Sequence, residues 1–266
     1  MNKLTNVKPS VGAESDEFFV GYLPTPPRLS RWLKRAVMAI VAVVVVTAAV
    51  VAALQNDPGD AVWTLDQEES WEGVLIARPY PMLKVTGPNG TRTLLLVSEG
   101  KQGVMDRLPA HDCDRVRVKG TLLQRDGRQM IELVSRDDAF VILSADAPDE
   151  RLRLPASIPW QPIELRGEII DPKCYLGAMK PGEGKTHKAC AALCLLGGIP
   201  PMFVSTDEQG RRTYYLLVAE AQKPVDGDAL EAFVSLVGDA VRLKGHVAAW
   251  GDLQLLKVNP DDVVRE

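Results

Sequence analysis

The stretch "DRVRVKGTLLQRDGRQMIEL" (Asp114–Leu133) recurs later in the chain as "DAVRLKGHVAAWGDLQLLKV" (Asp239–Val258), with Lys119-Gly120 aligned to Lys244-Gly245. Two further pairs of segments precede these blocks in the same order: "EGVLIARPY" (Glu72–Tyr80) with "RGEIIDPKCY" (Arg166–Tyr175), and "PMLKVTGPNGTRTLLLVSEGK" (Pro81–Lys101) with "PMFVSTDEQGRRTYYLLVAEAQ" (Pro201–Gln222). Because the blocks keep one order, they predict an internal repeat of one domain.

Each copy of the repeat is predicted to be mostly β-strand. The segment "IELRGEII" (Ile163–Ile170) alternates apolar and polar residues, as a half-buried strand does. One helix, "DALEAFVSLVG" (Asp228–Gly238) with Asp228 as its N-cap, interrupts the strands of the second copy. The resulting order of three strands, a helix and two strands is that of the OB-fold, a five-stranded Greek-key barrel. Another small β-barrel, or a β-sandwich split across both copies, would also fit the pattern.

We therefore expect a mainly β chain in which a single transmembrane helix is followed by two tandem OB-like five-stranded barrels. The predicted boundaries are a disordered cytoplasmic tail at 1–35, the transmembrane helix at 36–54, a linker at 55–68, the first OB-like domain at 69–145, a second linker at 146–162, and the second OB-like domain at 163–264 with an insert at 176–200.

The membrane prediction rests on the apolar run Ala36–Leu54, in which Thr47 is the only polar residue. As a helix it would extend roughly 28 Å, close to the thickness of a bilayer's hydrocarbon core. A cleaved signal peptide is the alternative, but its apolar region would be shorter and would follow a short basic start. Basic residues precede the run and acidic residues follow it, namely Arg28, Arg31, Lys34 and Arg35 before it and Asp57 and Asp60 after it. This asymmetry predicts a cytoplasmic N-terminus at a bacterial inner membrane, with the remaining chain in the periplasm.

The composition argues against several functions. The 266 residues carry 31 Lys and Arg against 35 Asp and Glu, a net charge of −4, so the chain has no general basic surface for nucleic acid. Its 4 cysteines are too few to build a disulfide scaffold of this length. The sequence shows no Ser/His/Asp set, no phosphate-binding glycine loop and no paired-carboxylate signature. We therefore expect a protein that binds or assembles rather than an enzyme.

The insert at 176–200 is the largest difference between the two copies. In the first copy Tyr80 runs directly into Pro81, whereas in the second copy the insert separates Tyr175 from Pro201. It falls between the first and second strands, in a loop that borders the ligand-binding face of OB-folds. A loop lengthened in one copy alone is more often functional than structural.

Within and beside this insert, Cys174, His187, Cys190 and Cys194 form the candidate site. The segment "THKACAALCLL" (Thr186–Leu196) is predicted to form a short helix capped by Thr186 and ended by Gly197-Gly198. His187, Cys190 and Cys194 then share one helix face, toward which Cys174 can fold back.

Four interpretations of these residues stay open at this stage. Three thiolates and an imidazole suit zinc or copper(I), although the spacing is not a standard zinc motif. A structural disulfide among Cys174, Cys190 and Cys194 would suit an oxidising compartment. Redox thiol chemistry at Cys190 near the helix start is the third interpretation, and an axial ligand for haem is the fourth.

Four lysines near the site could attract an anionic ligand or simply solvate the loop, namely Lys173, Lys180, Lys185 and Lys188. Cys113 with His111 is a weaker metal candidate, and His246 is expected in a barrel wall.

The segments "GEIIDPKCYLG" (Gly167–Gly177), "GKTHKACAALC" (Gly184–Cys194) and "GGIPPM" (Gly197–Met202) together resemble a motif of bacterial exported or membrane-anchored proteins of unassigned function. This resemblance implies no activity. The architecture is also loosely similar to an anchored periplasmic OB-fold protein, the haem chaperone of cytochrome c maturation. That family uses a His-x-x-x-Tyr motif, whereas His246 here is followed at that spacing by Trp250, so a haem-chaperone role is not supported.

The N-terminal tail contains aromatic residues in a proline-rich setting, and Phe18, Phe19 and Tyr22 are candidate anchors onto a membrane partner. The sequence thus predicts a membrane-anchored periplasmic binding or assembly subunit that holds zinc or copper at its Cys/His site, or that joins another inner-membrane protein or a membrane redox complex. A thiol–disulfide oxidoreductase-like protein and an interaction module with a structural disulfide are the alternatives.

Overall fold

The structure is a computed structural model that describes residue 21 and residues 25–55, 60–87, 90–110, 112–143, 158–220 and 223–266. Phe18, Phe19, Tyr22 and most of the predicted linker at 146–162 lie outside the described residues. His111 lies outside them too, and Cys113 is described only by its backbone. The chain divides into two compact units, Met1–Asp57 and Pro58–Glu266, so both predicted OB-like domains belong to the second unit.

The first unit contains helix α1 (Pro27–Leu54), which has 28 residues and is long and apolar enough to cross a membrane. The helix begins at Pro27 rather than at Ala36, so residues 27–35, which we assigned to the tail, are helical. Proline suits the first helical position because its fixed φ angle matches a helix and its missing N–H has no partner there.

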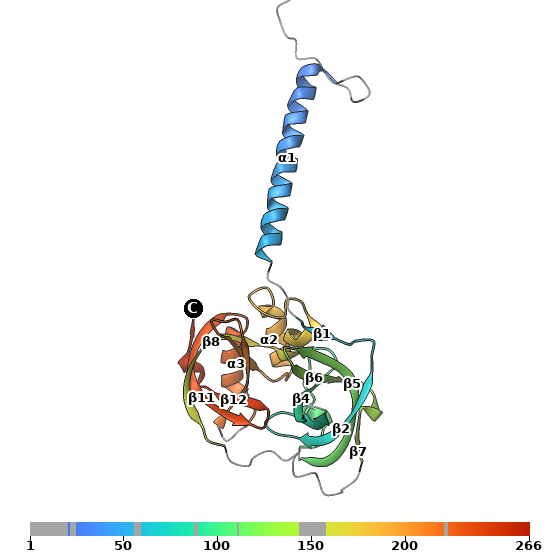
Figure 1. The fold of residues 1–266 in the computed structure, drawn as a ribbon, viewed down its shortest axis with the longest axis vertical. Helices are drawn as coiled ribbons and strands as arrows, with labels where there is room; N and C mark the ends of the chain where they lie inside the picture. The colour runs from blue at the N-terminus through green and yellow to red at the C-terminus, as the bar shows by residue number, and fades with distance from the viewer. Residues whose placement is uncertain are drawn as a thin grey trace, which may run out of the picture. The chain divides into compact units, whose positions relative to one another are not determined.

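The second unit consists mainly of two antiparallel-rich sheets, shown in cyan to green and in yellow to red in Figure 1. The first sheet contains β1 (Val62–Trp63), β2 (Glu69–Ile76), β3 (Met82–Gly87), β4 (Gly90–Ser98), β5 (Cys113–Arg125), β6 (Arg128–Leu133) and β7 (Phe140–Ile142). Strand β5 pairs with both β2 and β6, and β6 pairs in parallel with β4. These pairings close strands β2 to β6 into a five-stranded barrel, as predicted.

The second sheet contains β8 (Gln161–Ile170), β9 (Met202–Thr206), β10 (Arg212–Val218), β11 (Ala240–Trp250), β12 (Leu253–Lys257) and β13 (Val263–Arg265). Its pairings follow the order of the first sheet: β11 pairs with both β8 and β12, and β12 pairs in parallel with β10. Helix α3 (Gly227–Leu236) lies between β10 and β11 in the chain, which is the predicted element order. In the corresponding segment of the first sheet, the described residues contain the short helix η1 (Met105–Arg107).

Helix α3 starts differently from the prediction. Its N-cap is Asp226 rather than Asp228, and no side chain caps the helix. The helix therefore starts two residues earlier than predicted, and its first residue, Gly227, takes a positive φ of 51°, which glycine adopts without steric cost. Asp228 instead lies in the first turn, where a carboxylate is stabilised by the helix dipole.

Glycines stand where neighbouring strands approach most closely. A Cβ atom on Gly120 would lie 2.1 Å from the Glu132 carbonyl oxygen, and one on Gly245 would lie 2.6 Å from the Lys257 carbonyl oxygen. Both residues belong to the repeated Lys-Gly pair, and they lie in β5 and β11. The close contacts explain why both strands carry glycine at this position.

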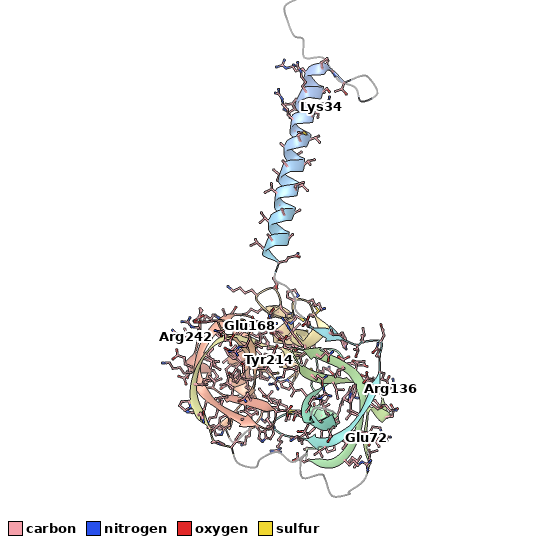
Figure 2. All side chains as sticks on the ribbon, in the orientation of Figure 1. Lys34, Glu72, Arg136, Glu168, Tyr214 and Arg242 are labelled. Carbon is pink, nitrogen blue, oxygen red and sulfur yellow. The ribbon has the colours of Figure 1, made fainter. Side chains whose placement is uncertain are left out.

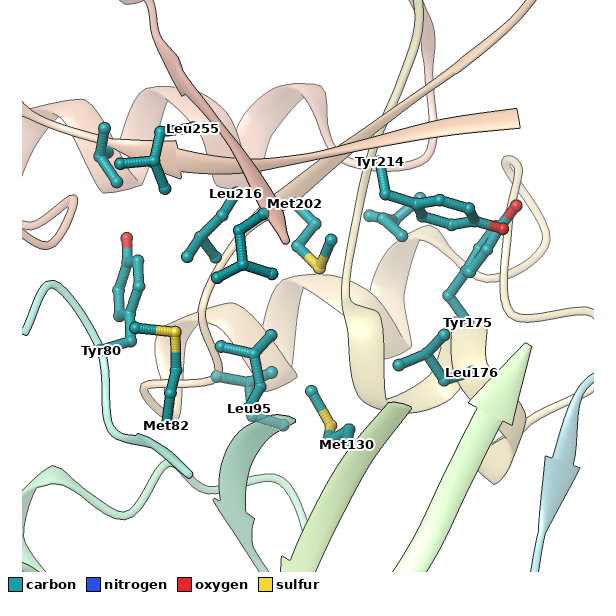
Figure 3. Packing of buried hydrophobic residues seen from close by; sticks show 14 of the residues in the cluster. Tyr80, Met82, Leu95, Met130, Tyr175, Leu176, Met202, Tyr214, Leu216 and Leu255 are labelled. Carbon is teal, nitrogen blue, oxygen red and sulfur yellow. The ribbon is translucent and has the colours of Figure 1, made fainter. Parts of the chain in front are cut away.

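The largest hydrophobic cluster contains residues of both sheets (Figure 3). It combines Met82, Leu95 and Met130 of the first sheet with Met202, Leu216 and Leu255 of the second sheet. The same cluster contains Cys174, Leu176 and Cys194 of the insert region. The insert therefore packs at the junction of the two sheets and not on an outer surface of the second sheet alone.

Candidate metal centre

The candidate site is built by the segment that connects β8 to β9. After β8 the chain enters the short helix η4 (Cys174–Ala178), and helix α2 (Lys188–Leu196) follows. The predicted α2 is confirmed, but its N-cap is His187 and no side chain caps it, so Thr186 does not have the predicted role. The His187 N–H donates to the Gly184 carbonyl oxygen across 3.0 Å, which holds this stretch in a turn until the helix begins.

The cysteines of this segment converge as predicted. Cys174, Cys190 and Cys194 are free thiols, and the Sγ atoms of Cys174 and Cys190 lie 3.9 Å apart. Two thiolates on one tetrahedral zinc ion, each with a metal–sulfur bond of about 2.3 Å, lie about 3.8 Å apart. The observed sulfur separation therefore already matches that of two ligands on one metal ion.

The four predicted ligands divide between two groups that share Cys174. One group is Cys174, His187 and Cys190, and the other is Asp171, Cys174 and Cys194; within each group the ligand atoms lie within 4.8 Å of one another. Asp171 was not predicted from the sequence. Its position before Cys174 in "DPKC" was the available signal, since a carboxylate close in sequence to a cysteine is a possible further ligand.

Two polar atoms in this site are buried without a hydrogen-bond partner. They are His187 Nε2 and Asp171 Oδ2, on side chains that are 3% and 0% exposed, and they lie 3.7 Å apart. The other carboxylate oxygen of Asp171 accepts from the Lys173 N–H across 2.9 Å and from the Cys174 N–H across 3.4 Å. The Asp171 side chain is therefore held in place by one oxygen while the other faces the thiols and the imidazole.

The electrostatics of the site favour an ionised Asp171 carboxylate beside a protonated Cys174 thiol. Burial acts to raise the pKa of Asp171, but the neighbouring His187, Cys174 and Cys194 side chains outweigh it and hold that pKa below its ordinary value. The adjacent Cys194 thiol, burial and the Asp171 charge raise the pKa of Cys174. Without a metal ion Cys174 therefore keeps its proton, which a binding metal would displace.

Lys101 reaches this site from the first sheet, in the loop that follows β4. Its Nζ atom donates to Cys190 Sγ across 2.6 Å and lies 3.8 Å from Cys194 Sγ. The hydrogen bond to Cys190 raises the pKa of Lys101, so its ammonium stays charged. The loop is fixed against the insert, because the Gly103 N–H donates to the Gly197 carbonyl oxygen across 2.9 Å. Lys101 was not predicted as a site residue.

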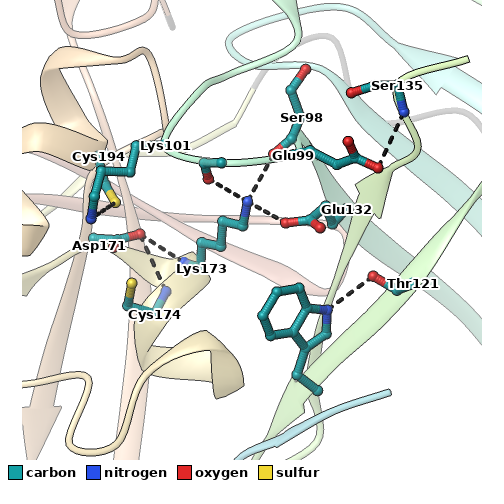
Figure 4. A network of polar contacts seen from close by, with 12 residues as sticks. Ser98, Glu99, Lys101, Thr121, Glu132, Ser135, Asp171, Lys173, Cys174 and Cys194 are labelled. Atoms are coloured by element: carbon teal, nitrogen blue, oxygen red, sulfur yellow. Dashed lines mark hydrogen bonds and ion pairs between the residues drawn. The ribbon is translucent and has the colours of Figure 1, made fainter. Parts of the chain in front are cut away.

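Lys173 has neither of the two roles considered for the lysines of the insert region, attraction of an anionic ligand or solvation of the loop. It is 3% exposed, and its ammonium forms an ion pair with Glu132 in β6 (Figure 4). The same Nζ donates to the carbonyl oxygens of Ser98 across 2.8 Å and Gly100 across 2.5 Å. Lys173 therefore ties the strand that leads into Cys174 to the loop that carries Lys101.

Lys188 is also engaged within the protein. Its Nζ atom lies 2.6 Å from Asp239 Oδ2 and donates to the Ser235 carbonyl oxygen across 2.8 Å. These contacts attach helix α2 to the last turn of α3 and to Asp239, which follows that helix. The positive charge of Lys188 is therefore already paired with the Asp239 carboxylate, and this lysine is not available for an anionic ligand.

Glu168, labelled in Figure 2, lies in β8 close to the same insert. Its Oε1 atom accepts from the Gly184 N–H across 2.7 Å and so anchors the turn that precedes α2. Burial raises the pKa of Glu168 to about 7, although the hydrogen bond from Gly184 acts in the opposite direction. This carboxyl therefore titrates near neutral pH.

His246 is the remaining histidine among the described residues, and it lies in β11 as predicted. It lines a surface cavity of about 570 Å³ together with Lys244 and Lys257, away from the cysteines.

Comparisons of the chain with models of protein families, with curated proteins and with solved structures found no match.

Proposed function

We propose that this protein is a membrane-anchored binding or assembly subunit that holds a thiophilic metal ion at Asp171, Cys174, His187, Cys190 and Cys194. The observation that carries the proposal is the pair of buried, unpartnered atoms, His187 Nε2 and Asp171 Oδ2, beside three free thiols. Each buried polar atom without a partner costs about 1–3 kcal/mol. Bound metal would provide the partner that these atoms lack.

The donor set indicates the class of metal. Thiolate sulfur favours zinc or copper(I) over magnesium and calcium, which prefer oxygen ligands. The imidazole nitrogen and the carboxylate oxygen complete a set that zinc accepts. The lysine beside Cys190 would donate to a metal-bound thiolate, as outer groups around metal sites commonly do.

The proposal places this centre outside the inner membrane. Helix α1 would span the membrane with its N-terminus in the cytoplasm, because basic residues precede its apolar part. The two sheets would be tandem OB-like barrels that arose from one repeated domain, since their strands pair in the same order. Phe18, Phe19 and Tyr22 of the tail would contact another inner-membrane protein or a redox complex.

The decisive experiment is metal analysis of the full-length chain, purified in detergent under reducing conditions, combined with counting of free thiols. The proposal predicts stoichiometric zinc or copper that protects the thiols from alkylation. The variants His187→Ala and Cys190→Ser should hold less metal than the natural chain, whereas His246→Ala, a histidine outside the site, should hold as much. Metal content and stability that do not change in either site variant would contradict the proposal.

Thiol–disulfide chemistry is a second candidate, favoured by the 3.9 Å between the sulfur atoms of Cys174 and Cys190. Oxidation of these two thiols by a partner disulfide would form one disulfide here and two thiols on the partner. Reversible exchange of this kind, without bound metal, would support an oxidoreductase-like role. A stable disulfide without exchange would instead support a structural staple in an interaction module.

A further inference from the structure

We infer that this centre has two adjacent metal positions that share the Cys174 thiolate. The inference rests on the proposed function and specifies its stoichiometry. The first position is formed by Cys174, His187 and Cys190, and the second by Asp171, Cys174 and Cys194. Cys174 is the one residue common to both sets of ligand atoms, so its sulfur would bridge the two ions.

The unpartnered atoms are distributed in the way that two ions require. His187 belongs to the first position and Asp171 belongs to the second. His187 Nε2 and Asp171 Oδ2 are both buried without a hydrogen-bond partner. A single ion at the first position would leave Asp171 Oδ2 without a ligand. A single ion at the second position would leave His187 Nε2 in the same state. Occupancy of both positions satisfies both atoms.

The thiols that are not shared are also separated. Cys190 belongs only to the first position and Cys194 only to the second. Lys101 Nζ lies near both, 2.6 Å from Cys190 Sγ and 3.8 Å from Cys194 Sγ. Its positive charge would offset part of the negative charge that three thiolates and one carboxylate bring together. The ammonium would therefore reduce the repulsion between the two terminal thiolates without occupying either metal position.

The two positions differ in their access to solvent. All three ligands of the second position are buried, whereas Cys190 in the first position is partly exposed. A metal ion would therefore reach the centre through Cys190. Thiophilic ions, namely zinc or copper(I), are the ligand class for both positions, because each position has two sulfur donors.

The test uses the full-length chain in detergent, reduced and free of metal, titrated with Zn²⁺ against a chromophoric chelator and, separately, with Co²⁺. We expect two equivalents of tightly bound metal and sulfur-to-cobalt charge-transfer bands that grow through both equivalents. The variants Cys194→Ser and His187→Ala should each retain one equivalent, and Cys174→Ser should lose both. The control His246→Ala should retain two equivalents.

A second measurement on the unsubstituted chain protects the test against variants that fail to fold. Two Co²⁺ ions bridged by one thiolate couple magnetically, so the electron paramagnetic resonance signal should fall as the second equivalent binds. A wild-type endpoint at one equivalent would overturn the two-position inference and leave the proposed function standing. An endpoint at zero would overturn both.

Discussion

Lys101 and Cys190, which lie in segments that connect strands of different sheets, are joined by a hydrogen bond of 2.6 Å from Nζ to Sγ. The lysine lies after β4 of the first sheet, and the cysteine lies on α2 in the insert of the second sheet. The candidate metal centre is therefore completed only when the two sheets pack together. This arrangement ties any metal site on the insert to the packing of the whole second unit.

The first prediction concerns this contact. Lys101→Met keeps most of the side-chain length but removes the ammonium that donates to Cys190. Loss of such an outer contact typically lowers metal affinity about 10- to 100-fold, and we expect a decrease in this range when zinc binding is measured by chelator competition. Lys180, which is exposed and lies in the insert that carries Cys190, provides the control variant Lys180→Met. Equal affinities in the two variants would show that Lys101 has no part in the centre.

The second prediction concerns the buried ion pair between Lys173 and Glu132. Glu132→Gln removes the carboxylate and leaves the Lys173 ammonium buried without its counter-charge. The expected loss of unfolding free energy is about 3–5 kcal/mol, measured by chemical denaturation. The carbonyl oxygens of Ser98 and Gly100 would still accept from this ammonium, which favours the lower end of the range.

The matched control for this variant is the exposed pair between Lys119 and Asp138, whose side chains are 32% and 51% exposed. Exposed ion pairs contribute little to stability because water screens them. Asp138→Asn should therefore leave the denaturation midpoint almost unchanged. A Glu132→Gln variant as stable as this control would mean that Lys173 is not buried against β6.

The third prediction is a pH dependence caused by Glu168. Burial raises its pKa from 4.5 to about 7 in the folded protein, so the folded state binds this proton more tightly than the unfolded state. Its contribution to stability is therefore present below about pH 4.5 and is lost as the pH rises toward and through 7. Glu168→Gln should be more stable than the natural chain at pH 8, by up to roughly 3 kcal/mol.

This difference should shrink as the pH is lowered toward 5, where Glu168 is protonated in the folded protein. The measurement is the unfolding free energy of both chains from pH 5 to pH 8. Glu164→Gln changes an exposed glutamate on the same strand and serves as the control. A stability difference that grows as the pH falls would have the wrong sign for this explanation.

The fourth prediction tests the close approach of β8 and β9. A Cβ atom on Gly167 would lie 1.9 Å from the Val204 carbonyl oxygen, which is backbone and cannot move aside cheaply. Gly167→Ala should therefore destabilise the protein by about 1–3 kcal/mol or more, as measured by denaturation. Gly87→Ala is the control, because the nearest atom at 3.3 Å there belongs to the flexible Arg92 side chain. Similar stability of the two variants would contradict the observed strand packing.

The part of the fold that could be predicted from the sequence depends on local patterns. The recurrence of Lys119-Gly120 as Lys244-Gly245 indicated that the two glycines occupy corresponding positions in the two copies. The strands around them could be predicted because strand alternation and turn residues are local signals. The segment Thr186–Leu196 was likewise predicted to form a helix ended by Gly197-Gly198, and the structure contains helix α2 there. Helix periodicity is sufficient to bring such residues to one face.

The parts that could not be predicted depend on tertiary contacts. Lys101 looks like an ordinary loop lysine in sequence, and it becomes a site residue only because Gly103 and Gly197 dock two distant segments. A lysine is ordinarily expected at the surface, so the sequence gives no sign that Lys173 is buried. Its burial depends on the ion pair with Glu132 in the other sheet. Asp171 lies next to the predicted motif, but only the backbone path after β8 directs its carboxylate toward the thiols.

The most direct test of the central claim is the zinc K-edge X-ray absorption spectrum of the full-length chain loaded with zinc. A centre formed by Asp171, Cys174, His187, Cys190 and Cys194 predicts a sulfur shell at about 2.3 Å together with nitrogen or oxygen at about 2.0–2.1 Å. The sulfur shell should weaken in Cys190→Ser. A spectrum with nitrogen and oxygen neighbours alone would contradict the assignment of these cysteines as metal ligands.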